Sequence, residues 1–346
     1  MKQDVYTRVT ETILEALEQG TRPWMQPWNA AHAAGPVSRP LRHNGQPYNG
    51  INTLMLWGAA MEKGYTAPIW MTYKQAKELG AHVKKDERAS LVVYANRIIK
   101  TETNAETGED EEHEIPFMKP YSVFNVEQIE GLPAHYYAKA EPVVLPEAER
   151  IEKLDAFFTA TGADIRHGGN RAFYRIDQDF IQMPDFTAFK DREGYYTTLA
   201  HENTHWTRHP SRLNRDMGRK KWGDAGYAME ELVAEIGSAF LCAELGLTPE
   251  VREDHAAYIQ SWLQVLKNDK KAIFTAASQA QKATDYLLGL QPQPGPDPEP
   301  EAEGSPPAPE PEPAPDAAPI PAAVEESTAS GPALPDRTPT VQLSFF

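Results

Sequence analysis

The stretch from Thr197 to Trp206 contains His201, Glu202 and His205 in the spacing H-E-x-x-H. On a helix of about 3.6 residues per turn, histidines four apart project within about 40° of each other, so both rings can bind one metal ion. Glu202 projects about 100° from His201, which lets its carboxylate polarise a water on the ion without being a ligand. We predict a helical metal site with both histidines as ligands and Glu202 as the general base.

A catalytic zinc site takes three protein ligands, so a third donor must come from another element. The segment Tyr227–Leu241 has a helical apolar pattern that also carries acidic residues. Glu231 and Glu235 lie four apart, so one can bind the metal while the other accepts the free ring N–H of a ligand histidine. We predict Glu231 as the ligand and Glu235 as the acceptor, with Glu230 and Glu235 left as alternative ligands. Zn²⁺ is the expected metal, and these residues do not distinguish it from Mn²⁺.

The H-E-x-x-H motif also has a simpler interpretation. It arises by chance in unrelated helices, where the His–Glu pair lies on a solvated face. The loop between the two helical segments contains Pro210, Gly218 and Gly223, which favour a chain reversal that returns a third ligand. This context favours the metal site over the solvated face.

The composition separates a globular part from a C-terminal tail. The 346 residues include 50 Asp and Glu against 34 Lys and Arg, a net charge of −16. Residues 291–346 hold 16 of the 30 prolines and ten acids, too polar to bury a core, so we predict a disordered tail. The single cysteine, Cys242, excludes an intramolecular disulfide and favours a cytoplasmic location. No apolar run approaches the ~20 residues of a membrane span, so no membrane partner is expected.

Two folded domains are predicted, residues 1–137 and 145–290, in an α+β arrangement that mixes helices with strands. Helices are expected at residues 4–18, 51–63, 72–79, 147–161, 194–209 and 227–241, with a final pair within 257–290. Strands are expected at residues 90–100, 115–124, 163–167 and 172–183. The acidic stretch 101–114 is expected to be a solvated hairpin loop. Strands ahead of the metal-binding helix suit a zincin-like fold.

The first hundred residues are locally basic, with 13 Lys and Arg against 8 Asp and Glu, although the acidic chain as a whole argues against nonspecific adhesion to nucleic acid. Single strands are held by cationic grooves that follow the phosphates and by aromatic rings that stack on bases. This half interleaves both groups, so we predict that it binds single-stranded DNA. An ordinary solvated face is the alternative for the cations, and core packing is the alternative for the tryptophans. The candidate residues are Trp24, Trp28, Arg42, Tyr48, Asn49, Trp70, Tyr73, Lys74, Lys84, Lys85 and Arg88.

Residues of both halves resemble the ArdC-type antirestriction proteins of conjugative plasmids, whose N-terminal domain is shared with TraC-type plasmid primases. The resemblance covers roughly residues 3–290. It is carried by Pro23–Trp24, Pro27–Trp28, Pro47–Asn52, Trp70–Ala76, Tyr121–Gln128, His201–Thr207, Arg212–Arg215 and Glu230–Glu235. It implies a single-stranded-DNA-binding domain followed by a zincin-like metallopeptidase domain, and a role in protecting incoming plasmid DNA during conjugation.

The last six residues form an apolar peptide after the polar tail, with Gln342, Leu343, Phe345 and Phe346. The peptide is similar to the short Q-L-S/D-L-F motif that docks on the bacterial sliding clamp. That resemblance predicts that Leu343 and Phe346 fill a pocket while Gln342 hydrogen-bonds its rim. A chance apolar terminus is the alternative.

Together these features predict an antirestriction-type protein that binds single-stranded DNA and carries a metallopeptidase site for an unknown protein substrate. Two other classes stay open. The first is a pure DNA-binding protein whose metal site is structural or vestigial. The second is a dedicated metalloprotease recruited to the replication clamp, in which the basic half recognises protein.

Overall fold

The computed structural model describes residues 4–24, 39–103, 110–137, 146–218, 224–248 and 255–292. These ranges belong to one compact unit that ends at Pro292. The C-terminal peptide with Gln342, Leu343, Phe345 and Phe346 lies outside the described residues, as does the predicted tail from residue 293 onward. None of the described helices is both long enough and apolar enough to cross a membrane.

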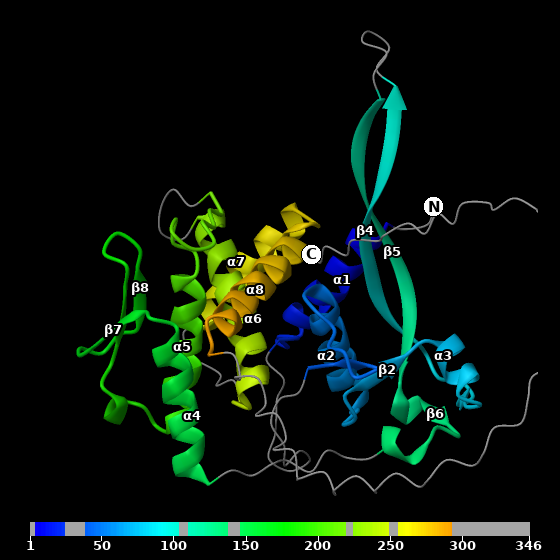
Figure 1. The fold of residues 1–346 in the computed structure, drawn as a ribbon, viewed down its shortest axis with the longest axis horizontal. Coiled ribbons are helices and arrows are strands. Elements are labelled where there is room, and N and C mark those ends of the chain that lie inside the picture. The colour runs from blue at the N-terminus through cyan, green and yellow to red at the C-terminus, as the bar shows by residue number, and fades with distance from the viewer. Residues whose placement is uncertain are drawn as a thin grey trace, which may run out of the picture. The chain divides into compact units, whose positions relative to one another are not determined.

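The N-terminal half combines helices with a four-stranded sheet in the order β1-β2-β5-β4 (Figure 1). β1 runs parallel to β2, the other neighbours are antiparallel, and β3 and β6 form a separate two-stranded sheet. The helices are α1 (Val5–Glu18), α2 (Ile51–Lys63) and α3 (Tyr73–Glu78), with 3-10 turns η1 (Val126–Gln128) and η2 (Ala134–Tyr136). The strands are β1 (Leu41–Arg42), β2 (Ile69–Met71), β3 (His82–Val83), β4 (Ser90–Thr103), β5 (Asp110–Asn125) and β6 (Ile129–Glu130).

The capping residues explain where these helices begin. The side chain of Asp4 accepts a hydrogen bond from the backbone of Thr7, and Thr72 forms a capping box with Gln75. The side-chain amide of Asn52 links α2 to the sheet through two hydrogen bonds of 2.8 Å. It donates one to the backbone carbonyl of Val93 and accepts the other from the Val93 backbone N–H. The expected helices at these three places are confirmed.

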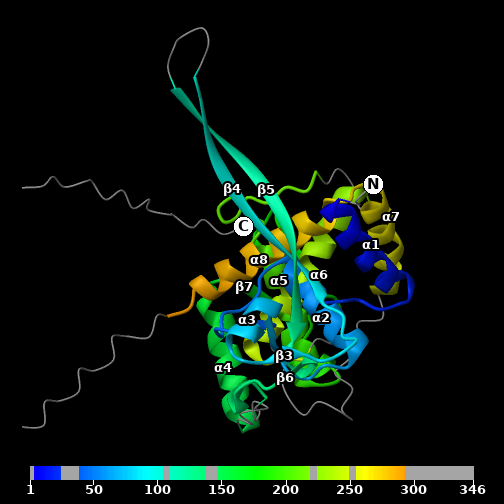
Figure 2. The same ribbon diagram turned by 90° about the vertical axis from the view of Figure 1, so that its right-hand side faces the viewer.

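The β4–β5 hairpin is longer than expected and extends away from the helices (Figures 1 and 2). Its register runs from Ser90 opposite Val123 to Thr103 opposite Asp110, so much of the acidic stretch 101–114 is paired strand instead of loop. The outer part leaves Tyr94, Ile98, Ile99 and Ile115 exposed. The antiparallel backbone pairing continues because each residue satisfies its neighbour's N–H and C=O groups even where the side chains face solvent.

The C-terminal half places a three-stranded sheet in the order β7-β9-β8 beside a group of helices. β7 and β9 are parallel and β8 and β9 antiparallel. The helices are α4 (Glu147–Ala160), α5 (Arg192–Trp206), α6 (Ala225–Leu245), α7 (His255–Asn268) and α8 (Ala272–Gly289), with the turn η3 (Phe186–Ala188). The strands are β7 (Asp164–His167), β8 (Phe173–Arg175) and β9 (Phe180–Met183).

The single strand expected at residues 172–183 is wrong, because a turn divides it into β8 and β9. Asp179 in this turn has a left-handed backbone, with φ 52°, which aspartate tolerates better than most residues. Its carboxylate accepts hydrogen bonds from Tyr174 and Arg212, which hold the turn closed. The side-chain pattern of a strand therefore runs across residues 172–183 even though the backbone turns at residues 176–179. The contacts of Asp179 with Tyr174 and Arg212 stabilise that turn.

One hydrophobic core joins the two halves. It combines Val9 and Ile13 of α1 and Leu54 of α2 with side chains of α6, α7 and α8 such as Phe240 and Trp262. The helix α1 lies against α7 (Figure 2). The predicted ranges 1–137 and 145–290 therefore pack through a shared interior, which a division into two linked domains did not anticipate.

Candidate metal centre

The H-E-x-x-H motif lies on a helix that is buried on every side. Asp191 caps α5 by accepting a hydrogen bond from the Gly194 backbone at 2.8 Å, and all residues from Gly194 to Trp206 are buried. His201, Glu202 and His205 are 7%, 4% and 8% exposed. The solvated-face interpretation of the motif is therefore wrong. Polar side chains inside a packed helix need partners, and a metal ion is one way to supply them.

A glycine allows α6 to approach α5 closely. A Cβ on Gly237 would lie 2.5 Å from Cγ2 of Thr204, so no larger residue fits without movement. Asp224 caps the start of α6 by accepting a hydrogen bond from the Tyr227 backbone at 2.8 Å. This close crossing brings the acidic residues of α6 within reach of the histidines of α5.

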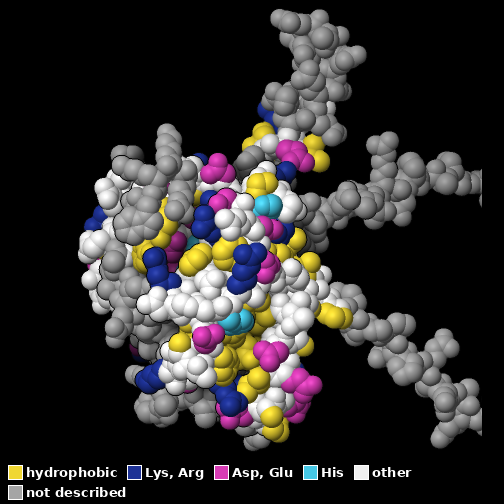
Figure 3. All heavy atoms as spheres, turned by 90° about the vertical axis from the view of Figure 1, so that its left-hand side faces the viewer, with side chains coloured by type: hydrophobic (Ala, Val, Ile, Leu, Met, Phe, Trp, Pro, Cys, Tyr) yellow, Lys and Arg dark blue, Asp and Glu magenta, His cyan; other side chains and the backbone are white. Residues whose placement is uncertain are grey.

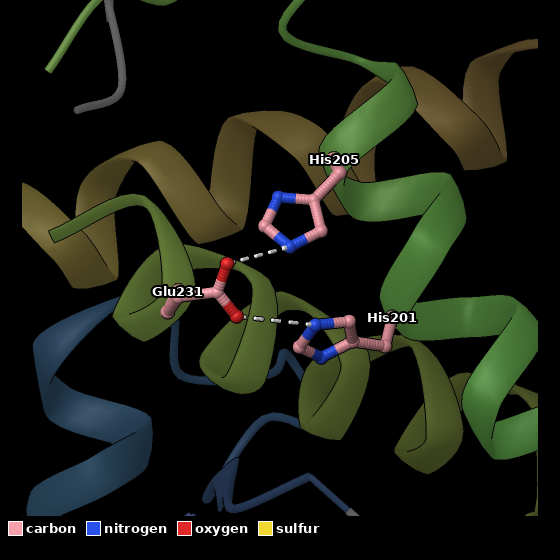
Figure 4. A group of neighbouring side chains, drawn as sticks. All are labelled: His201, His205 and Glu231. Atoms are coloured by element: carbon pink, nitrogen blue, oxygen red, sulfur yellow. Dashed lines mark ion pairs between the residues drawn. The ribbon is translucent and has the colours of Figure 1, made fainter. Parts of the chain in front are cut away.

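The structure brings His201, His205 and Glu231 together, and one ligand atom from each lies within 4.8 Å of the others (Figure 4). Nε2 of His201 is 3.8 Å from Oε2 of Glu231, and Nε2 of His205 is 3.6 Å from Oε1. Ligands about 2.05 Å from one tetrahedral zinc ion are about 3.4 Å apart, so the observed separations fit a shared cation with little adjustment. Two imidazoles and one carboxylate are a donor set that binds Zn²⁺ or Mn²⁺.

Each histidine turns its other ring nitrogen toward a second carboxylate. Nδ1 of His201 is 3.5 Å from Oε1 of Glu235, and Nδ1 of His205 is 3.1 Å from Oε1 of Glu230. A carboxylate on Nδ1 holds the proton there and leaves Nε2 free as a metal ligand. Of the three acids left open by the sequence, the geometry favours Glu231 as the ligand, with Glu230 and Glu235 as the acceptors.

Arg215 belongs to the site, although the sequence offered it only within the stretch Arg212–Arg215 that carries the family resemblance, with no role assigned. It contacts Glu230 through Nε at 2.9 Å and Nη2 at 2.8 Å, and also donates to the backbone of Thr204. Burial raises the pKa of Glu230, but the hydrogen bonds from Arg215 and His205 outweigh it and lower the pKa to about 2. Membership of that stretch could not assign the role, because the carboxylate that Arg215 pairs with lies on a separate helix.

The carboxylates also change the titration of His205. Burial lowers the pKa of this imidazole, but the negative charges of Glu231 and Glu230 outweigh burial and raise the pKa to about 10. The same attraction from His205 and His201 overcomes burial to lower the pKa of Glu231 well below its usual range. Charges of opposite sign are thus concentrated at the predicted ligands.

Glu202 is not one of the three clustered ligands. It is 4% exposed, and no hydrogen bond or ion pair joins it to another residue in the part of the chain that the structure describes. A carboxylate in this position can accept a proton from a water without first breaking an ion pair.

Three of the predicted base-stacking rings are core residues. Trp24 and Trp70 are 1% exposed and Tyr48 is 3% exposed. Trp24 packs edge-on against Trp262 with ring centroids 5.8 Å apart, and Trp70 packs similarly against Tyr65. A buried ring has no free face to offer a base. The stacking prediction is therefore wrong for Trp24, Tyr48 and Trp70, and the core interpretation is correct for Trp24.

The remaining predicted DNA contacts differ in accessibility. Trp28 lies outside the described residues. Arg42 is half-buried, with its guanidinium 5.4 Å from the centre of the Tyr48 ring. The exposed candidates are Asn49, Tyr73, Lys74, Lys84, Lys85 and Arg88. Most of them lie on or near α3 and β3, where the acids Glu78, Asp86 and Glu87 are exposed as well, and Tyr73 is the exposed ring among them.

The opposite side of the molecule, near α4 and β7, carries basic and acidic side chains interspersed with hydrophobic ones (Figure 3). Its exposed hydrophobic residues include Phe173, Ile176 and Phe186. Mixed charges attract a polyanion less than a surface of one sign.

Comparisons with known proteins agree with both halves. Residues 3–124 match the N-terminal domain of the anti-restriction factor ArdC, and residues 152–279 match a zincin-like metallopeptidase domain. The chain also aligns with the crystal structure of the metal-free antirestriction protein ArdC from plasmid R388, with 47% identity and a TM-score of 0.69 over 83% of this chain and 98% of that one. The chain belongs to the ArdC family of antirestriction proteins.

Further relatives extend this picture. The Mn(II)-bound structure of R388 ArdC matches with 45% identity and a TM-score of 0.68, over the same shares of both chains. Protein y4eC of Sinorhizobium fredii (strain NBRC 101917 / NGR234) is 43% identical over 288 residues, 82% of this chain and 91% of y4eC. The DNA primase TraC of Escherichia coli is 37% identical over 308 residues, but the match spans 28% of that primase. The chain thus aligns with nearly the whole of R388 ArdC but with only about a quarter of the TraC primase.

Proposed function

We propose that this ArdC-family protein binds single-stranded DNA through its N-terminal half and carries a zinc metallopeptidase site in its C-terminal half. In this role it would protect incoming plasmid DNA from restriction during conjugation. The observation that carries the proposal is the convergence of His201, His205 and Glu231 from two helices, with a carboxylate behind each imidazole. The Mn(II)-bound R388 relative supports a divalent metal, and Zn²⁺ is the ion we propose.

The residues around the centre can divide the work of peptide hydrolysis. A bound divalent ion polarises a carbonyl group and lowers the pKa of water toward neutrality. Glu202 accepts the proton of the attacking water and returns it to the leaving nitrogen. Glu230 and Glu235 keep the imidazoles of His205 and His201 in the ligand tautomer.

The metal centre is tested by metal analysis and proteolysis on the full-length protein. Wild type should bind about one ion, His201→Ala should lose it, and Glu202→Gln should keep the ion and lose hydrolysis of a peptide library. Glu202→Gln is a nearly isosteric change, so an effect reflects the lost base. Retained proteolysis in Glu202→Gln would exclude Glu202 as the base.

The same variants separate the proposal from a pure DNA-binding protein. Protection of a transferred plasmid is measured in a restricting host that expresses wild type or Glu202→Gln. A requirement for Glu202 supports a hydrolytic role. Equal protection by both proteins, together with normal metal content, favours the DNA-binding class with a structural metal.

We infer the DNA-binding surface from the exposed candidates near α3 and β3. Lys84, Lys85 and Arg88 are exposed, and Tyr73 has 58% of its side chain in solvent. Acids also occur here, since Lys74 pairs with Glu78, so a positive surface depends on the cluster and not on one residue. Oligonucleotide binding that weakens steeply with salt would support this surface.

A further inference from the structure

A second arginine, Arg22 of the N-terminal half, lies beside the metal centre and contacts Glu235. Nη1 of Arg22 lies 3.9 Å from Oε2 of Glu235, and the two side chains are 9% and 5% exposed. The other carboxylate oxygen of Glu235 faces Nδ1 of His201 at 3.5 Å. Arg22 is thus connected to a metal ligand through one carboxylate.

Packing on both sides holds Arg22 in this place. It follows α1, whose last buried residue Leu17 belongs to the shared core, and it precedes Trp24, which packs on Trp262 of α7. Pro23 lies against Gly58 of α2, where an added Cβ would meet it at 3.6 Å. The guanidinium is therefore placed by contacts made within the first 60 residues and with α7.

Behind each histidine lie a carboxylate and then an arginine, and the two arginines come from different parts of the chain. His205 is backed by Glu230 and then Arg215, which lie in the metallopeptidase segment. His201 is backed by Glu235 and then Arg22, which lies in the segment matching the N-terminal domain of ArdC. Each chain runs in the order ligand, carboxylate, arginine.

Arg22 and His201 lie on the two oxygens of one buried carboxylate. Glu235 is 5% exposed, and a charge at such a depth is costly unless it is paired. Loss of Arg22 would leave one oxygen of Glu235 without its guanidinium neighbour, so the carboxylate could turn away and weaken its hold on the His201 ring. Partners of this kind commonly alter metal affinity by about 10–100-fold.

We propose that Arg22 is a positioning residue of the metal centre, so that the N-terminal half of the protein completes the site in the C-terminal half. The inference rests on the proposed metal site. It predicts that metal affinity depends on an arginine of the DNA-binding half, far from the H-E-x-x-H motif in the sequence. The metallopeptidase segment alone would lack one of the two arginines.

The test compares three full-length variants. Arg22→Met removes the charge and keeps an apolar stem, and Arg22→Lys keeps the charge. Arg39→Met is the matched control, because Arg39 is another buried arginine of the N-terminal half that pairs with α6, through Glu244 at 2.9 Å, and Glu244 does not contact the ligands. Zn²⁺ and Mn²⁺ affinities are measured by chelator competition, and thermal unfolding is measured without metal.

Arg22→Met should weaken metal affinity about tenfold, the lower end of the range for groups that contact a ligand directly, because Arg22 acts through Glu235. Arg22→Lys should recover most of the loss. Arg39→Met should keep wild-type affinity even if it unfolds at a lower temperature. Co²⁺ added as a spectroscopic probe should show altered ligand-field bands in Arg22→Met only. Equal affinity in wild type and Arg22→Met, or equal losses in Arg22→Met and Arg39→Met, would overturn the inference. If Arg22→Met does not fold, affinity equal to that of wild type in Arg22→Gln would do the same. Absence of metal binding in wild type would instead refute the proposed metal site.

Discussion

Gly237 of α6 and Thr204 of α5 touch so closely that a single added methyl group would lie 2.5 Å from Cγ2 of the threonine. Thr204 is fully buried, and its hydroxyl donates to the backbone of Ala200 at 2.9 Å, so the side chain has little freedom to move. The contact lies close to the metal ligands, since Thr204 stands between His201 and His205 on α5, and Gly237 follows Glu231 on the same helix α6. The spacing of the two helices and the geometry of the site are therefore linked.

We expect Gly237→Ala to destabilise the protein by about 1–3 kcal/mol, the usual cost of overpacking, although alanine favours a helix. The forced separation of α5 and α6 should also weaken metal binding. Urea unfolding and chelator competition measure the two effects.

Gly289→Ala is the control for this change, because nothing lies within 4 Å of the position where its Cβ would be. It should leave stability within about 1 kcal/mol of wild type. Thr204→Ser removes the threonine methyl group that the added Cβ would strike, so it should restore part of the stability of Gly237→Ala. An undiminished metal affinity in Gly237→Ala would show that the contact does not set the geometry.

The second prediction concerns Arg215, which is paired with Glu230 in the interior. Arg215→Met leaves the Glu230 carboxylate beside His205 without the guanidinium, and breaking such a buried pair typically costs about 3–5 kcal/mol. Urea unfolding of the metal-free protein should show this loss, and metal affinity should fall with it. The double variant Arg215→Met, Glu230→Gln should recover part of the stability, because it removes the unpaired charge. A double variant as unstable as the sum of both single changes would contradict this account.

The third prediction concerns the pH dependence of metal binding. His205 has a pKa of about 10 without metal, because Glu231 and Glu230 outweigh the effect of burial. A metal ligand must be neutral, so an ion has to displace this proton. Between pH 6.5 and 8 the affinity should rise about tenfold per pH unit for one displaced proton. Chelator competition, corrected for protonation of the chelator, checks this, and an affinity independent of pH would disprove it.

The metal-free protein should respond to pH in the opposite direction. Its folded pKa for His205 lies above the value of about 6.5 expected for an unfolded chain. The protonated ring therefore stabilises the fold fully below about pH 6.5, and this contribution is lost as pH rises through about 10. Urea unfolding in the presence of a chelator should show that the free energy of unfolding falls as pH rises. In His205→Gln most of this fall should be absent.

The spacing of residues along single helices predicted much of the site. His201 and His205 share one helix, and the choice of Glu231 over its neighbours agrees with the observed convergence. Arg22 and Arg215 could not be predicted in the same way, because each lies in a loop and its partner is on α6. Only tertiary packing decides which carboxylate a loop arginine reaches.

The DNA-binding candidates show the converse difficulty. An aromatic ring between prolines fills a core more often than it faces solvent, but composition alone does not decide the case of a particular ring. Trp24 and Trp70 are core residues that pack against aromatic partners, Trp262 of α7 and Tyr65 of the loop between α2 and β2. The cations near β3 did not face this choice between core and solvent, since a charged side chain with no buried partner remains in water.

The last prediction separates core from surface in the N-terminal half. Trp24→Ala should cost about 3–5 kcal/mol in stability, because it empties a buried site against Trp262. The triple variant Lys84→Ala, Lys85→Ala, Arg88→Ala should keep stability within about 0.5 kcal/mol per site, since these side chains are exposed. It should weaken binding to a single-stranded oligonucleotide and lower the slope of log affinity against log salt by about 0.7 for each phosphate that the variant no longer neutralises. A triple variant with wild-type affinity and slope would remove this surface from the DNA interface, whereas a folded Trp24→Ala protein with wild-type stability would contradict the role of Trp24 in the core.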